Sequence, residues 1–167
     1  TTDGRVIGIC PGEGGLWVTT TKAPYFISGV TPDAMVQNKV TAIQAGVSKW
    51  SICNMGTAVV YASHDGLMTA RGVEVSPDWS FKFFTRDEWR ARYGSRLHLL
   101  HLNAHDGHLL GWFSDGSPGF LVRFDETDTS FTRTTDPIMA ATVHPIADAL
   151  YVVAGAVYEF KGGGTRK

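Results

Sequence analysis

The chain has little of several features that would indicate its class directly. Only two of its 167 residues are cysteine, Cys10 and Cys53, which is too few for a disulfide scaffold, and their positions lack metal-site spacing. No apolar run approaches the ~20 residues of a membrane-spanning helix. Fifteen basic and sixteen acidic residues give a net charge of −1. This balance argues against a dedicated nucleic-acid binder, which needs a clustered basic face.

What is present is typical of a folded, turn-rich protein. Apolar residues make up 43% of the chain, so disorder is excluded because enough apolar surface can be buried to offset the ordering entropy. Nineteen glycines and seven prolines indicate many turns between short strands. We expect one β-rich domain over residues 1–167. The start at Thr1 and the Gly-rich basic stretch at 161–167 predict a piece of a larger polypeptide, with a processed mature protein as the alternative.

Four β-hairpins are predicted from paired apolar runs joined by short turns. Asp65-Gly66 and Asp106-Gly107 are the clearest turns, because glycine accepts the positive φ that tight hairpins need. The expected hairpins cover residues 16–29, 58–71, 97–113 and 149–160. Their turns recur every 41–49 residues, a period typical of propeller blades. Further strands are expected at 5–9, 47–53, 120–124, 131–134 and 140–144.

The predicted fold class is therefore all-β. We expect a β-propeller-like array of about four short antiparallel sheets, the last of them incomplete; a β-sandwich is the less favoured alternative. One short helix is predicted at 85–93, with Thr85 and Glu88 forming a capping box and Gly94 ending it. A single helical turn is expected at 31–35, with Thr31 as its cap and Pro32 at its first position.

Metal-binding residue types occur in two places. Four histidines, with Asp106 among them, fall within eleven residues and could in principle ligate zinc: His98, His101, His105 and His108. On a strand His98 and His101 would point to opposite faces, so solvated histidines are favoured. The acidic residues 125–128 could ligate calcium, but they lack the spacing of an EF-hand loop. No metal or other cofactor is predicted.

Catalytic patterns are equally weak. Ser63-His64-Asp65 is contiguous, whereas a catalytic triad is assembled from residues distant in sequence. The glycine-rich residues 10–15 precede a strand rather than the helix of a phosphate loop. Asp65, Asp106 and Asp115 match a glycosidase pair by residue type only. We predict no catalytic residues and no enzymatic activity. Seven aromatic side chains on predicted strands are expected to pack in the core and between blades rather than to form a carbohydrate-binding or base-stacking platform: Trp17, Trp50, Trp112, Tyr25, Tyr61, Tyr151 and Tyr158.

Several segments, taken in order, resemble a family of virion proteins of tailed bacteriophages and prophages. No single motif is specific for this family, but the occurrence of all of them in the same order over roughly residues 6–160 is fairly specific. Gly46 stands where the family commonly has cysteine, and His64 where it has proline. The segments that carry the resemblance are 16–21, 24–29, 31–35, 45–49, 59–67, 83–89 and 148–153.

The resemblance implies a structural virion protein, most specifically a tail-nozzle, tail-tube or neck component in the DNA-ejection conduit. It implies a homo-oligomeric ring that contacts adaptor, portal or tail proteins and touches DNA in transit without sequence specificity. Assembly would occur in the reducing bacterial cytoplasm, so Cys10 and Cys53 are expected as free thiols. Two alternatives remain: a carbohydrate-binding tail component at the host surface, and a cellular propeller scaffold for protein partners.

Overall fold

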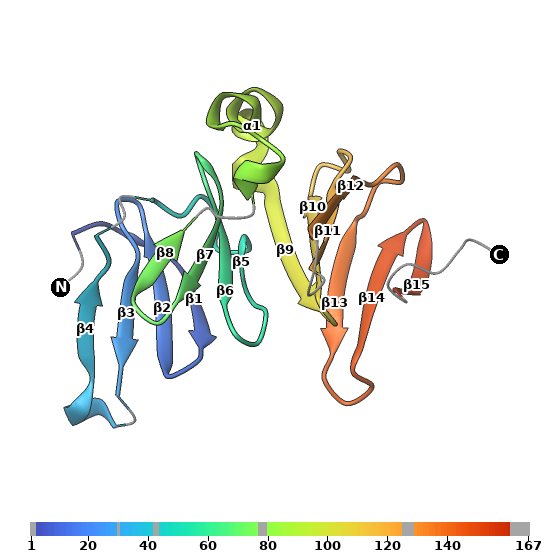
Figure 1. Cartoon of the computed structure of the whole chain (residues 1–167). Coiled ribbons are helices and arrows are strands. Elements are labelled where there is room, and N and C mark those ends of the chain that lie inside the picture. Colours follow the sequence, from blue (N-terminus) through green and yellow to red (C-terminus); the bar gives the residue numbers. More distant parts are fainter. Residues whose placement is uncertain (1–2, 30, 42–43, 77–79, 125–128, 161–167) are drawn as a thin grey trace. The chain divides into compact units, whose positions relative to one another are not determined.

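The computed structural model describes residues 3–29, 31–41, 44–76, 80–124 and 129–160. The fold is all-β, with four small antiparallel sheets and one short α-helix (Figure 1). In each sheet consecutive strands are neighbours, as in a propeller blade. The contacts divide the chain into two compact units, Thr1–His98 and Leu99–Lys167. Within the described residues no helix is both long and apolar enough to cross a membrane.

The first unit contains two four-stranded sheets. The sheets touch through their first strands, β1 and β5. The first sheet consists of β1 (Val6–Gly12), β2 (Gly15–Thr20), β3 (Tyr25–Ser28) and β4 (Val36–Lys39). The second consists of β5 (Ile52–Asn54), β6 (Val59–Ser63), β7 (Gly66–Arg71) and β8 (Glu74–Ser76).

The second unit contains a four-stranded and a three-stranded sheet. They touch through β9 and β13, again the first strand of each. The larger sheet consists of β9 (Leu100–His105), β10 (His108–Phe113), β11 (Phe120–Phe124) and β12 (Thr129–Arg133). The smaller consists of β13 (Ala140–His144), β14 (Ala149–Ala154) and β15 (Ala156–Phe160). The predicted incomplete last sheet is thus confirmed within the described residues.

The predicted helix is confirmed as α1 (Arg86–Tyr93). Its capping box forms in both directions: the Glu88 N–H donates to Thr85 Oγ1, and the Thr85 N–H donates to the Glu88 carboxylate. The prediction that the helix ends at Gly94 is confirmed, because α1 stops at Tyr93 with Gly94 as its C-cap. Gly94 has φ −51° and the chain continues as a 3₁₀ helix, η3 (Gly94–Leu99). Figure 1 shows these helical turns leading into β9.

Two further boundaries and one predicted cap differ from expectation. Residues 97–99 belong to η3 rather than to the third hairpin. Residues 47–51 form an irregular turn, so the strand predicted at 47–53 is reduced to β5. Thr31 precedes η1 (Pro32–Ala34) as expected, but its side chain makes no capping hydrogen bond. One more short 3₁₀ helix, η2 (Ser80–Lys82), lies before α1 in the chain.

Each unit has its own apolar core between its two sheets. In the first unit Trp17, Phe26, Tyr61 and Met68 pack together with Cys10 and partly buried Ile52. In the second, a cluster centred on Trp112 joins the two sheets, and its buried members are Leu110, Trp112, Ile138, Leu150 and Val152. The central strands β6, β7 and β10 are buried along almost their whole length, so both faces of these strands are covered.

Candidate functional site

A pocket lies in the first unit, at the ends of its hairpins. It has a volume of about 680 Å³, a size common for small-molecule sites. Its walls come from the β2–β3 turn, the chain after β4, the β6–β7 turn and α1. The apolar part of the wall is formed by Ala23, Val40 and Ala45, and the charged residues are Asp3, Lys22, Lys39, Asp65 and Arg90.

Gln44 and Asp65 form a polar cluster on one side of this pocket. The Ser63 hydroxyl donates to Gln44 Oε1 at 2.8 Å, and Gln44 Nε2 donates to the Asp65 carboxylate at 3.3 Å. Arg90 of α1 forms an ion pair with the same carboxylate. Burial acts to raise the pKa of Asp65, but the bonds from Gln44 and Arg90 outweigh it and hold this pKa below its usual value. Asp65 is therefore a stable anion that joins the β6–β7 turn to α1.

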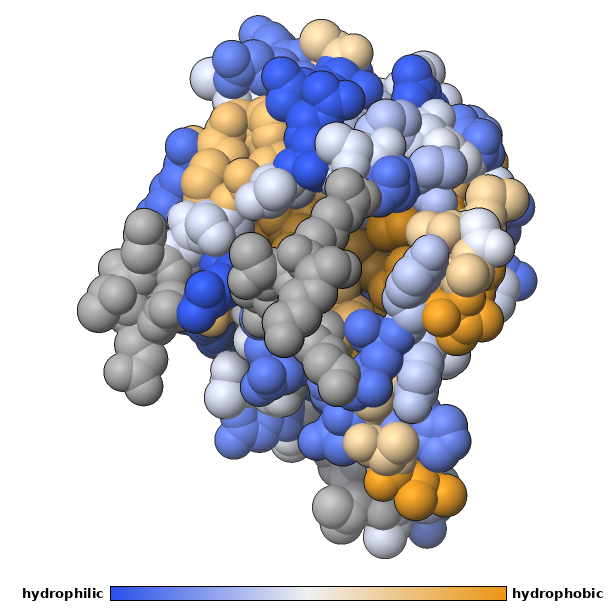
Figure 2. Space-filling view, turned by 90° about the vertical axis from the view of Figure 1, so that its right-hand side faces the viewer, coloured by the Kyte–Doolittle hydropathy of each residue, from blue (hydrophilic) through white to orange (hydrophobic). Residues whose placement is uncertain are grey.

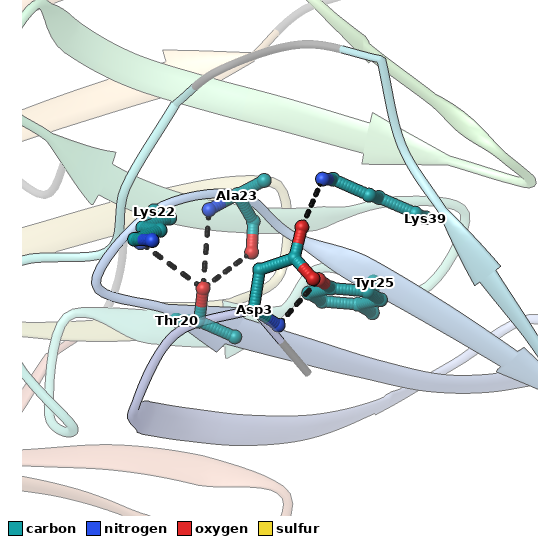
Figure 3. A network of polar contacts seen from close by, with 6 residues as sticks. All are labelled: Asp3, Thr20, Lys22, Ala23, Tyr25 and Lys39. Carbon is teal, nitrogen blue, oxygen red and sulfur yellow. Dashed lines mark hydrogen bonds and ion pairs between the residues drawn. The ribbon is translucent and has the colours of Figure 1, made fainter. Parts of the chain in front are cut away.

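A second polar cluster joins the β2–β3 turn, Lys39 and the segment before β1 (Figure 3). Lys39 forms an ion pair with Asp3, whose N–H donates to the Tyr25 hydroxyl at 2.9 Å. The hydrogen bond and charge of Lys39 lower the pKa of Asp3. Thr20 Oγ1 accepts from the backbone N–H groups of Lys22 and Ala23 and donates to the Ala23 carbonyl. These bonds tie down the β2–β3 turn and the segment that precedes β1.

No triad is assembled from Ser63-His64-Asp65. The Ser63 hydroxyl donates to Gln44 and Asp65 accepts from Gln44 and Arg90, so both are bonded to groups other than the imidazole. His64 is exposed at the turn. An acid–base relay needs the imidazole between nucleophile and carboxylate. Ser63, His64 and Asp65 are therefore not arranged as a relay, because Gln44 and Arg90 hold the hydroxyl and the carboxylate instead.

The histidine group is dispersed. His98 lies in η3, not on a strand, whereas His101 is on β9 and stacks on Trp112 with 4.1 Å between ring centroids. His105 Nδ1 lies 3.7 Å from an Asp148 carboxylate oxygen, and buried His108 contacts the Asp106 carbonyl. Over the part of the chain that is described, no group of three or more histidine, cysteine or acidic side chains could hold a metal ion. The acidic residues 125–128 lie outside that part.

The remaining candidate residues lie in turns and strands. Asp115 Oδ1 accepts from the Ser117 N–H at 2.9 Å, while Asp106 has φ 45° in the β9–β10 turn. The glycine-rich residues 10–15 form the end of β1, a turn and the start of β2, as predicted. Cys10 and Cys53 are free thiols. Burial raises the pKa of Cys10 to about 11 and raises that of Cys53 still further.

The aromatic residues divide into two sets. Trp17, Tyr25, Tyr61 and Trp112 are buried on strands and Tyr151 is half-buried on β14, in line with core packing. Trp50 and Tyr158 are 54% and 56% exposed. Trp50 lies in a turn rather than on a strand, so the core role predicted for it is wrong. For Tyr158 the predicted strand is confirmed, but the core role is wrong, because its strand β15 is the last of a three-stranded sheet and leaves the ring exposed.

Two pocket residues, Gln44 and Arg90, were not predicted from the sequence. Gln44 lies 21 positions from Asp65 and Arg90 lies 25 positions from it. Neither has a local motif, because a single glutamine in a connection and an arginine near a helix end are both common on surfaces. The only available signal was Asp65, and its place in a predicted hairpin turn already explained it.

Comparisons with known proteins give a fold likeness and no family. No protein-family model matches the chain, and no curated protein matches its sequence. Among solved structures, a chain of PorZ is similar with a TM-score of 0.55 and 10% sequence identity. PorZ is described as an essential bacterial surface component of the type-IX secretion system of Porphyromonas gingivalis. The likeness covers 95% of the present chain and 20% of the PorZ chain. At this identity it shows a shared β architecture alone.

Proposed function

We propose that this chain is part of a structural protein of a bacteriophage virion, in the tail nozzle, tail tube or neck. It forms part of the conduit through which DNA leaves the particle, and it has no enzymatic role. Its partners are further copies of itself in a closed ring, together with adaptor, portal or other tail proteins. The protein assembles in the bacterial cytoplasm and resides in the virion.

The observation that carries this proposal is the ordered set of segments that resembles phage virion proteins. In the fold these segments form mainly strands of the hairpins, and some of their residues also line the pocket. Residues 16–21 and 24–29 supply β2 and β3, residues 59–67 supply β6 and its turn, and residues 148–153 supply most of β14. The part shared with the phage proteins would then be the packed β framework, as expected of an assembly protein.

The surface chemistry supports the same role. Where the structure is described, polar side chains at the pocket form ion pairs and turn-stabilising bonds, with no nucleophile beside a base. The three-stranded sheet also leaves β15 at an edge, with Val157 and Tyr158 exposed. Proteins normally cover or pair such edges, and a head-to-tail interface that closes into a ring would do so in every copy.

Cryo-electron microscopy of the virion tests this proposal directly. The expected result is density for this fold in a closed ring on the tail axis. Density in a peripheral fibre, as a trimer or monomer, would overturn the ring and leave the virion assignment standing. If mass spectrometry of purified particles finds no peptide of the protein, both are overturned.

A further inference from the structure

A shallow depression of about 340 Å³ in the first unit is lined by basic and apolar side chains. It lies between the start of β1 and the turn before β5, apart from the pocket described above. Its charged or titratable lining residues are all bases, Arg5, Lys49 and His98. None of these three side chains is paired with a carboxylate among the described residues. Trp50 and the apolar side chains Val6, Ile7 and Val47 complete the wall.

Hydrogen bonds of two buried serines and of β6 fix the turn that carries Trp50. Ser48 and Ser51 are buried, and the Ser51 hydroxyl and N–H both donate to the Ser48 carbonyl, at 2.9 and 3.2 Å. The Trp50 N–H donates to Ser48 Oγ at 3.1 Å, and the Ala62 N–H of β6 donates to the Ser51 carbonyl at 2.8 Å. The two residues at the tip, Lys49 and Trp50, are thereby fixed in position while both remain exposed.

The turn also fits closely against β1. A Cβ atom added to Gly8 would lie 3.6 Å from the Lys49 Cα and 3.0 Å from Ile52 Cγ2. The absence of a side chain at Gly8 thus allows the turn to rest on the strand. Lys49 Nζ lies 4.5 Å from the centre of the Trp50 ring, within cation–π range. The indole is 54% exposed, an arrangement that core packing does not account for.

This combination selects for a particular ligand chemistry. The Arg5 guanidinium and the Lys49 ammonium offer only hydrogen-bond donors, so the ligand must supply anionic acceptors. The indole offers a flat face for stacking. A phosphate next to an unstacked base satisfies both, and basic grooves with exposed aromatic rings are the usual means of binding single-stranded nucleic acid.

We propose that the depression formed by Arg5, Lys49, Trp50 and His98 binds a short segment of single-stranded nucleic acid, with one base on Trp50 and the adjoining phosphates on the basic side chains. The site is local, so it is compatible with the net charge of −1 that argues against a dedicated nucleic-acid binder. It does not depend on the proposed virion role, since the residues that form it belong to one folded unit.

The probe is a short fluorescein-labelled oligothymidylate, titrated with the full chain at low salt and followed by fluorescence anisotropy. Trp50→Ala should weaken binding by about tenfold or more, whereas Trp50→Phe should retain most of it because the ring still stacks. Lys49→Ala and Arg5→Ala should each weaken binding. Each should also lower the slope of log affinity against log salt by roughly 0.7 for every phosphate that is no longer neutralised.

Two matched controls make the result decisive. Tyr158→Ala removes an aromatic side chain of similar exposure, and Lys22→Ala removes an exposed cation at the other pocket; both should bind the probe like the original chain. Thermal melting checks that each variant is folded. The proposal is overturned if the unaltered chain does not bind the probe, or if Trp50→Ala and Tyr158→Ala are indistinguishable. Binding of an acidic oligosaccharide at this site without binding of the oligonucleotide would also overturn it.

Discussion

Asp106 and Gly107, between β9 and β10, have φ values of 45° and 69°. Two consecutive positive φ values match the twist of the flanking strands, as in a type I′ hairpin turn. A Cβ at Gly107 would also lie 3.3 Å from the Phe124 carbonyl oxygen. Gly66 also has a positive φ, 152°, as predicted, but it begins β7 and pairs with Ser63, so His64 and Asp65 form the β6–β7 turn and neither of them has a positive φ.

We therefore expect Gly107→Ala to lower the free energy of unfolding by about 1–2 kcal/mol, the usual cost of a left-handed alanine. Gly94→Ala is the matched control. Gly94 has φ −51°, and the nearest atom to an added Cβ is 3.9 Å away, so this variant should be neutral or slightly stabilising. Urea denaturation of both variants measures the difference. Equal midpoints would contradict the assigned turn conformation.

The raised thiol pKa of Cys10 has a consequence for stability at high pH. An unfolded Cys10 ionises near its ordinary pKa of 9.0, whereas the folded thiol stays neutral up to about 11. Its contribution to stability is therefore fully present below pH 9 and is lost as pH rises toward 11. The loss amounts to at most about 2–3 kcal/mol.

Lysine and tyrosine titrate in the same range, so the measurement is a comparison. Chemical denaturation of the original chain and of Cys10→Ala, on both sides of pH 9, should show a steeper decline for the original chain. Parallel declines would mean that the Cys10 thiol ionises as easily in the folded state as in the unfolded state. A thiol reagent should also react slowly with both cysteines until the chain is unfolded.

Within single elements, the pairing of β10 with β11 depends on a missing side chain. Gly111 pairs with Phe120, and a Cβ at Gly111 would lie only 2.2 Å from Cζ of the Phe120 ring. The ring therefore lies over the glycine, where it also stacks on Phe131 with 5.3 Å between centroids. Both Gly111 and Phe120 are buried, so the ring has no free space into which it could move.

Gly111→Ala should destabilise the chain by about 1–3 kcal/mol, as overpacking of a filled core does. The double variant Gly111→Ala/Phe120→Leu should recover part of that loss, because the smaller side chain vacates the space needed by the new methyl group. Calorimetric melting of the single and double variants tests this coupling. If the losses of stability in Gly111→Ala and in Phe120→Leu simply add in the double variant, the ring does not lie over Gly111 in solution.

On the scale of the whole molecule, the three-stranded sheet is the last of an otherwise regular series of four-stranded sheets. Figure 2 faces the side on which β14 and β15 lie in Figure 1 and shows apolar surface between hydrophilic patches. Exposed large apolar residues of the second unit are Met139, Ile146, Val157 and Tyr158. Val157 and Tyr158 lie on β15, beside backbone groups that a further strand could pair.

We expect the chain to self-associate through this edge, and Val157→Lys to reduce the association because a charge on an edge strand opposes pairing. Val73→Lys is the matched control: Val73 is 54% exposed but lies in the turn between β7 and β8. Sedimentation analysis over a range of concentrations gives the association constants. If Val73→Lys and Val157→Lys behave alike, association does not involve β15.

Features that depend on neighbouring residues could be predicted from the sequence. The capping box of Thr85 and Glu88, the Asp106-Gly107 turn and the four hairpins each involve contacts that are local or joined by a short turn. Paired apolar runs joined by recurring turns were sufficient to indicate an all-β fold. The phage-virion role, inferred from ordered segments, stays a proposal.

The tertiary structure alone decided where irregular segments lie and which distant side chains meet. Residues 47–51 have strand-like composition, but burial of Ser48 and Ser51 and the bond from Ala62 hold them as a turn. Gly94 ends α1 as its sequence suggests, but the 3₁₀ helix that follows it and buries Leu97 was not predicted. The meeting of Gln44, Asp65 and Arg90 depends on the packing of three segments. Long-range burial sets these outcomes, and no local pattern encodes it.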